Sequence, residues 1–440
     1  MEKEVRTKFL DDLKRSAKPY SEMEVFYKNA PHKMPVFEID LDYLLYNKYN
    51  GRISSMVKSF EHQFHELNSE NSTDKKTIED FLWNSSTTSN EVTLEDIRQK
   101  NQLKYGIVTK DGIIIDGNRR ALMLSKIFGS AHPIYFKAAI LDERLEDNVK
   151  EIMRLETTYQ MGEDAKVDYN AIEKYLKCKD LRELGFTNEE IAKMMGERVP
   201  DIKTYLATMG YMDDYLKKVG YDGIYTRLEK TEGLFVNLVA YLDAYGHSYD
   251  EESGLFKYRN AGRGRQKMDW NPGSDDLNDL KLIYYDVIRA RFSGEGKEYR
   301  QLGKPDKDDS IFCKEAVWEE FKKNHFEKIE PLTDAEPSVK QISEENPKGD
   351  LAKLLRVRDE AWGKQASGYL KGNMGIAIRR LDDLKEKTAP MKLLQKALDT
   401  LEVIDCQNEA FYDDPAAEDL TNKINKLMWD FKQAIKHNRR

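Results

Sequence analysis

The sequence predicts an α+β protein, with a small mixed β core on the N-terminal side followed by a predominantly α-helical remainder that contains a helix-turn-helix. Alternating apolar and polar residues at 35–41 and a strongly apolar run at 133–141 are typical of strands. Between them, Asp111 and Gly112 separate two short apolar runs, which favours a tight hairpin because glycine tolerates a positive φ. From about Glu146 onward, apolar residues recur at helical spacing.

The elements around the hairpin follow from local signals. Residues 1–34 are expected to form an N-terminal arm or helix. A Ser/Thr/Asn cluster at 84–90 indicates a loop, and Thr93 is expected to cap the helix that follows it. The hairpin strands are expected at 105–109 and 113–115, and the three isoleucines of the second favour a buried strand.

Composition limits the classes of function. The chain has 440 residues, 40% of them hydrophobic, and a net charge of −8, which argues against a uniformly basic surface for nucleic-acid binding but allows a local basic face. No apolar run approaches the roughly 20 residues that a membrane span needs. The N-terminal residues do not have the apolar run of a signal peptide, and the spacing of the three cysteines fits neither a metal site nor a set of disulfides. We therefore expect a cytoplasmic protein that does not bind membranes.

The predicted chemistry centres on the end of the second hairpin strand. Five consecutive residues follow the isoleucines and open an apolar helix at 121–128, namely Asp116, Gly117, Asn118, Arg119 and Arg120. A glycine turn at a helix N-terminus presents unpaired N–H groups and the positive end of the helix dipole. Two guanidinium groups add donors suited to phosphate, so an anion is the expected ligand. An ordinary strand–turn–helix junction with two solvated arginines is the alternative.

This stretch resembles the signature box of the ParB/sulfiredoxin superfamily. In ParB-like partition proteins the box reads Gly-x-Arg-Arg and binds a nucleoside triphosphate, and Gly117 to Arg120 match it position by position. Sulfiredoxin has a reactive cysteine where this chain has Asn118, so the resemblance implies nucleotide binding rather than thiol chemistry. It implies CTP or ATP as the cofactor, with Mg²⁺ held by Asp116, since hard cations favour carboxylate oxygen.

Two further segments resemble the boxes that flank this motif in ParB proteins. Asn50-Gly51-Arg52 follows an expected strand and short helix, which would make Arg52 another phosphate-binding arginine; a turn with a solvated arginine is the alternative. Glu156 and Gln160 resemble the later acidic-then-glutamine box, although their spacing is one residue longer than in the family. The resemblance makes Glu156 a catalytic candidate together with Asp116.

Residues 185–206 fit a helix-turn-helix without a gap. Thr187 is expected to cap the first helix and Gly196 to make the turn. The candidate DNA-binding residues carry side chains that can contact phosphates or bases, and they are Arg198, Lys203, Thr204 and Tyr205. A helical hairpin that only packs is the alternative, because several nearby acidic residues oppose phosphate. The order of the arginine box and this segment is that of ParB proteins.

The chain is expected to contain six successive regions. They are an N-terminal arm or helix (1–34), a ParB/sulfiredoxin-like nucleotide-binding domain (35–145), a helix-turn-helix domain (146–215), a helical middle domain (216–330), a linker (331–350) and a C-terminal helical interaction domain (351–440). The last of these is expected to join a homodimer or a partner protein through its helices.

The function expected from these features is that of a ParB-like, nucleoside-triphosphate-binding, DNA-associated protein, acting as a slow CTPase or ATPase clamp or switch. Two alternatives remain open. One is a ParB-like nuclease in plasmid or phage-defence biology, which would need clustered acidic metal ligands. The other is a non-catalytic interaction scaffold on a degenerate ParB fold.

Overall fold

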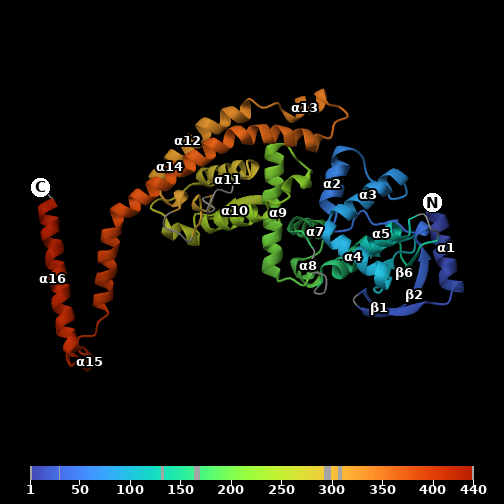
Figure 1. Cartoon of the computed structure of the whole chain (residues 1–440), viewed down its shortest axis with the longest axis horizontal. Coiled ribbons are helices and arrows are strands. Elements are labelled where there is room, and N and C mark those ends of the chain that lie inside the picture. Colours follow the sequence, from blue (N-terminus) through green and yellow to red (C-terminus); the bar gives the residue numbers. More distant parts are fainter. Residues whose placement is uncertain are drawn as a thin grey trace. The chain divides into compact units, whose positions relative to one another are not determined.

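The computed structural model describes residues 2–28, 30–129, 133–162, 169–291, 299–305 and 310–438 (Figure 1). The chain divides into two compact units, Met1–Ala377 and Ile378–Arg440. Within the described ranges, none of the helices combines the length and the apolar character that a membrane span requires.

A mixed six-stranded sheet forms the N-terminal side of the first unit. Its strands are β1 (Ser21–Tyr27), β2 (Ala30–Asp40), β3 (Leu45–Tyr46), β4 (Gly106–Val108), β5 (Ile113–Asp116) and β6 (Tyr135–Ile140). Their order is β1-β2-β6-β4-β5-β3; β1, β2 and β6 are antiparallel neighbours, β4 is parallel to β6 and antiparallel to β5, and β3 is parallel to β5. The predicted α+β class and the β4–β5 hairpin are therefore confirmed.

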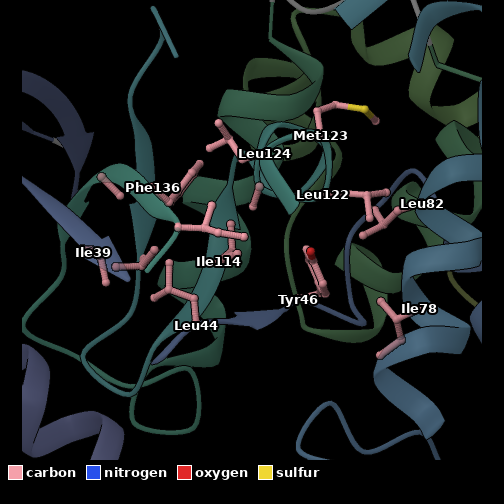
Figure 2. Packing of buried hydrophobic residues seen from close by; sticks show 14 of the residues in the cluster. Ile39, Leu44, Tyr46, Ile78, Leu82, Ile114, Leu122, Met123, Leu124 and Phe136 are labelled. Atoms are coloured by element: carbon pink, nitrogen blue, oxygen red, sulfur yellow. The ribbon is translucent and has the colours of Figure 1, made fainter. Parts of the chain in front are cut away.

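Helices cover both faces of this sheet. One face packs against α1 (Lys3–Ser16), α2 (Ser54–Gln63), α3 (Ser72–Asn84), α4 (Thr87–Lys100) and α5 (Asn118–Phe128), and the other against α6 (Val149–Met161). Ile114 belongs to the first core, part of which Figure 2 shows. Ile115 belongs to the second core, as the alternation of side chains along a strand requires. Burial of each such side chain contributes about 1.5–3 kcal/mol.

The rest of the chain is mostly helical. Its helices are α7 (Ala171–Glu183), α8 (Asn188–Met195), α9 (Val199–Val219), α10 (Glu232–Tyr245), α11 (Ser274–Arg289), α12 (Glu315–Asp334), α13 (Val339–Glu345), α14 (Leu351–Glu402), α15 (Glu409–Tyr412) and α16 (Pro415–Asn438). This part of the chain also contains a two-stranded hairpin, β7 (His247–Asp250) and β8 (Leu255–Tyr258), and the 3₁₀ helices η3 (Tyr225–Leu228), η4 (Arg263–Lys267) and η6 (Ile311–Cys313). The 3₁₀ helix η1 (Leu41–Tyr43) lies between β2 and β3.

The predicted helix pair is present as α8 and α9. Thr187 caps α8 in a capping box with Glu190, and Gly196 ends the helix with a left-handed φ of 59°. The two helices pack through a shared apolar core that includes Ile191, Met195 and Ile202. α9 continues well past the predicted end at residue 206, to Val219.

Three local predictions differ from the structure. The helix expected within residues 1–34 is present as α1, but the same region also contains β1 and the start of β2, whose pairing with each other outweighs their weak local signal. The predicted loop at 84–90 is largely helical, so Thr93 lies inside α4 and donates to the Ser89 carbonyl at 2.8 Å rather than capping a helix. The predicted linker at 331–350 contains the end of α12 and all of α13.

Candidate functional site

A cavity of about 1010 Å³ opens beside the C-terminal end of β5. Residues distant in sequence line it, including Arg52, Asn118, Arg119, Arg120, Gln160 and Lys193. Among the described residues, the charged groups of the lining are five cationic side chains and the single carboxylate of Asp116. The structure thus brings Arg52 together with the glycine–arginine stretch, and the surface that they form favours an anion.

Gly117 makes the junction between β5 and α5 possible. Its φ of 102° is left-handed, a conformation that side chains with a Cβ disfavour. A Cβ at this position would lie 2.7 Å from Cζ of Phe136 and 3.3 Å from Nη2 of Arg120. The glycine is therefore needed for the turn and for the close approach of two side chains to the backbone.

Asn118 begins α5, and its side chain is buried and hydrogen-bonded through both its oxygen and its nitrogen. Its Oδ1 accepts the Asn47 N–H at 2.9 Å, and its Nδ2 donates to the Ile114 carbonyl at 2.8 Å. These bonds tie the segment after β3 to the end of β5. Any contribution of Asn118 to ligand binding would therefore come from its backbone rather than its amide side chain.

Arg119 is oriented by α4. Its Nε donates to Oδ1 of Asn90 at 2.7 Å, and its Nη2 donates to Oγ of Ser89 at 2.9 Å. Asn90 is itself buried, because its Nδ2 donates to the Leu82 and Trp83 carbonyls at the end of α3. The amide thus links the end of one helix to the first arginine of the box. Sequence analysis missed Asn90 because it assigned the residue to a loop.

Arg120 folds back over the strand that precedes it. Its Nη2 pairs with Asp116 at 2.5 Å, and its Nη1 donates to the carbonyls of Lys104 and Tyr105 at 2.6 and 2.9 Å. Asp116, predicted to hold Mg²⁺, is therefore an ion-pair partner in this structure. Within the described ranges, no group of three or more His, Cys, Asp or Glu residues is arranged to bind a metal ion.

Arg52 reaches the same cavity through an aromatic contact. Its guanidinium lies 4.7 Å from the centre of the Tyr169 ring, a distance typical of a cation–π interaction. The Tyr169 hydroxyl donates to Oε1 of Gln160 at 2.8 Å, and Gln160 donates to the Ile115 carbonyl at 3.2 Å. This chain of contacts joins the two flanking segments, which contain Arg52 and Gln160, to β5, the strand that leads into the arginine box.

Glu156 does not line the cavity, although it was predicted to be catalytic. Its side chain is fully buried, it pairs with Lys177 on α7, and it accepts the Gly51 N–H at 3.2 Å. Burial raises the pKa of this carboxyl, and Lys177 opposes the shift. A group that contacts neither the cavity nor solvent is poorly placed to act on a ligand there, so its geometry is that of a structural ion pair beneath the Arg52 segment.

A second buried carboxylate supports the same segment. Glu173 accepts hydrogen bonds from the backbone N–H of Ser55, at 3.1 Å, and from its hydroxyl, at the start of α2. Burial raises its pKa to about 7. Sequence analysis missed Glu173 and Lys177, because acidic and basic residues four apart on a helix usually form a solvated pair.

The candidate DNA-binding residues lie at the start of α9, where Arg198 is the N-cap and the other three are on the first turns. Lys203 and Thr204 are exposed, whereas Tyr205 is half-buried against Tyr175, with ring centres 5.1 Å apart. Arg198 is 82% exposed but forms a two-point ion pair with Asp201, at 2.7 and 2.8 Å. These residues do not line the cavity, but Lys193 and Gly196 of the helix pair do.

Comparison of the chain with protein-family models, with curated proteins and with solved structures found no significant match.

Proposed function

We propose that this chain is a nucleoside-triphosphate-binding, DNA-associated protein whose phosphate site is the cavity at the end of β5. The observation that carries the proposal is the convergence of Arg52, Arg119 and Arg120 on a single cavity with only one carboxylate among its described lining. Its volume of about 1010 Å³ is at the upper end of the range of small-molecule sites. The resemblance of the box to that of ParB proteins favours CTP or ATP with Mg²⁺.

The same cavity supports a switch-like mechanism. Lys193 near the end of α8 and Gly196 in the turn before α9 contribute to its lining, so a ligand would contact the helix pair as well as the arginine box. Slow hydrolysis of the nucleotide would then change contacts to the helices that present Lys203 and Thr204. Those two exposed residues are the proposed DNA contacts.

The proposal includes a homodimer through the C-terminal helices. Along α16, Leu420, Ile424, Leu427 and Phe431 recur at the alternating four- and three-residue spacing of a coiled coil. All four are at least 36% exposed, and two such stripes would bury each other.

The test is calorimetric titration of the full chain with CTP, ATP, GTP and UTP in the presence of Mg²⁺. Arg120→Ala removes charge-assisted hydrogen bonds worth about 1.5–3 kcal/mol, so we expect a loss of affinity of about 10- to 100-fold. Arg98→Ala is the matched control, because Arg98 is exposed on α4 and does not line the cavity. Absence of binding heat for all four nucleotides would favour the alternative that the chain is a non-catalytic interaction scaffold.

Asp116→Asn separates two roles of the carboxylate. If Asp116 only neutralises Arg120, the variant will bind nucleotide with unchanged dependence on Mg²⁺. If it holds the metal, the affinity for nucleotide will fall with Mg²⁺ present and stay unchanged in EDTA. Release of inorganic phosphate, measured on the same samples, shows whether the bound nucleotide is hydrolysed.

A further inference from the structure

A second cavity, of about 710 Å³, lies in the first unit among η3, the end of α11 and the first half of α14. It shares no lining residue, among those described, with the cavity beside β5. Its charged lining comprises seven cationic and four acidic side chains of the described chain. The excess of positive charge is concentrated in two layers, a buried floor and an exposed rim.

The floor is a cluster of arginines around one buried carboxylate. Asp359 on α14 accepts from Nε of Arg227 at 3.1 Å, from Nε of Arg289 at 3.0 Å, and from Nη2 of Arg358 at 3.1 Å. Glu336 supplies a further partner to Arg289 at 2.6 Å. Arg227, Arg289 and Asp359 line the cavity, whereas Arg358 and Glu336 are not among its lining residues. Three guanidinium groups share two carboxylates in this cluster, which leaves a net positive charge where the local dielectric constant is low.

The rim carries three cations without an ion-pair partner in the part of the chain that the structure describes. Lys230, Arg291 and Lys364 are exposed, and their side chains form no hydrogen bond or salt bridge to any residue that the structure describes. Two of the rim carboxylates are already paired on α14 or at its start: Asp350 with Lys353 and Glu360 with Arg356, each at 3.3 Å. The three cations therefore face the cavity opposed by Glu229 alone among the described lining.

The described lining offers charged groups but no exposed aromatic face. Tyr221 is the aromatic residue of the described lining, and it is only 1% exposed, so it offers no face for a base to stack on. Lys364 lies on α14, whereas Lys230 follows η3 and Arg291 follows α11. A polyphosphate carries several anionic groups along its length, which suits cations that come from different elements of the lining.

We propose that this second cavity binds a small polyphosphate anion, independently of any attached nucleobase, and that the ligand connects the first half of α14 to η3 and the end of α11. The inference does not depend on the nucleotide site, because no residue is shared. The ligand would neutralise the three rim cations, which have no ion-pair partner among the described residues and would otherwise repel one another.

The experiment is calorimetric titration of the full chain with tripolyphosphate, in an Arg120→Ala background that weakens the first cavity. The double variant Lys230→Ala/Arg291→Ala is expected to bind at least about 10-fold more weakly, and Lys364→Ala about 5-fold more weakly. Lys340→Ala is the control, because Lys340 is exposed on α13 outside the cavity, and it should bind as the parent does. Equal affinities in all variants would overturn the proposal.

A steric variant tests the site without removing a charge. Gly363 lies on α14 in the lining, and a Cβ there would meet nothing closer than Ala290 Cα at 3.9 Å. The first side-chain atom therefore fits, and leucine has a higher helix propensity than glycine. Gly363→Leu should reduce tripolyphosphate affinity at least about 5-fold, and its melting temperature without ligand checks that the variant folds as the parent does. Hydrogen exchange across 351–367 should slow on binding in the parent but not in this variant. Tighter binding of a single-stranded oligonucleotide than of tripolyphosphate, dependent on the same residues, would overturn the assignment of a small ligand.

Discussion

The ion pair between Glu156 and Lys177 gives a sharp test of whether this carboxylate is structural. Both side chains are almost completely buried, and each is the other's charged partner in the described chain. Replacing Lys177 by Met keeps the length and volume of the side chain but leaves Glu156 as an uncompensated buried charge. Breaking a buried pair in this way costs about 3–5 kcal/mol, a large fraction of the roughly 5–15 kcal/mol that stabilises a typical domain.

The pH dependence of this loss follows from the carboxyl group. Burial already raises the pKa of Glu156, and removing Lys177 removes the main group that opposes the shift. A folded-state pKa above the unfolded value means that the native state takes up a proton as the pH falls. The cost of Lys177→Met should therefore be complete above the folded-state pKa and should shrink steadily as the solution is acidified.

A double variant completes a double-mutant cycle for this ion pair. Glu156→Gln keeps an oxygen that can accept the Gly51 N–H and removes the charge, so Glu156→Gln/Lys177→Met should recover to within about 1.5 kcal/mol of the parent. The assay is hydrogen exchange of α6 and α7 peptides at pH 6 and pH 8, which reports local opening without assuming two-state unfolding. A single Lys177→Met variant as protected as the parent at pH 8 would refute the reasoning. A double variant whose α6 and α7 peptides are less protected than those of the single variant would also refute it.

Three other predictions follow from the structure. The raised pKa of Glu173, about 7, means that native stability falls as pH rises from about 4.5 to 7; at about 1.4 kcal/mol per pKa unit this amounts to about 3 kcal/mol. Glu173→Gln should make the free energy of unfolding, measured by urea denaturation, less dependent on pH between about 4.5 and 7. An unchanged pH dependence would contradict the raised pKa of Glu173. Gly117→Ala should reduce the free energy of unfolding by about 2 kcal/mol, and so lower the melting temperature, because its Cβ would strain the turn and meet Phe136. A variant as stable as the parent would show that the junction relaxes. Leu427→Asp should convert a dimer to a monomer in sedimentation equilibrium, whereas a monomeric parent would refute the proposed dimer.

Sequence analysis succeeded where a local signal sufficed. The hairpin follows from the Asp-Gly pair, with Gly112 at a φ of 86°, and from the isoleucine strand after it. The helical spacing predicted from about Glu146 onward is confirmed by α6, which begins at Val149, and the cap and turn of α8 lie at Thr187 and Gly196 as predicted. In each case the deciding interactions join residues within a few positions of each other.

The misses share the opposite property. β1 exists because it pairs with β2, and its edge position leaves it with a weak apolar pattern. Asn90 matters because its amide connects the end of α3 with Arg119, a contact between residues 29 positions apart. Whether Glu156 faces a ligand or a buried lysine depends on how α6 packs against α7, and no short motif specifies that packing.

The arrangement around Arg120 resolves an apparent conflict at the proposed phosphate site. A carboxylate beside the site would repel an anion, yet Asp116 lines the same cavity. A guanidinium has five N–H donors, and three are used by Asp116 and the carbonyls of Lys104 and Tyr105, which leaves two for a ligand. Arg120 can thus neutralise Asp116 and still donate to a phosphate, and the missing Cβ of Gly117 lets it fold back far enough to do both.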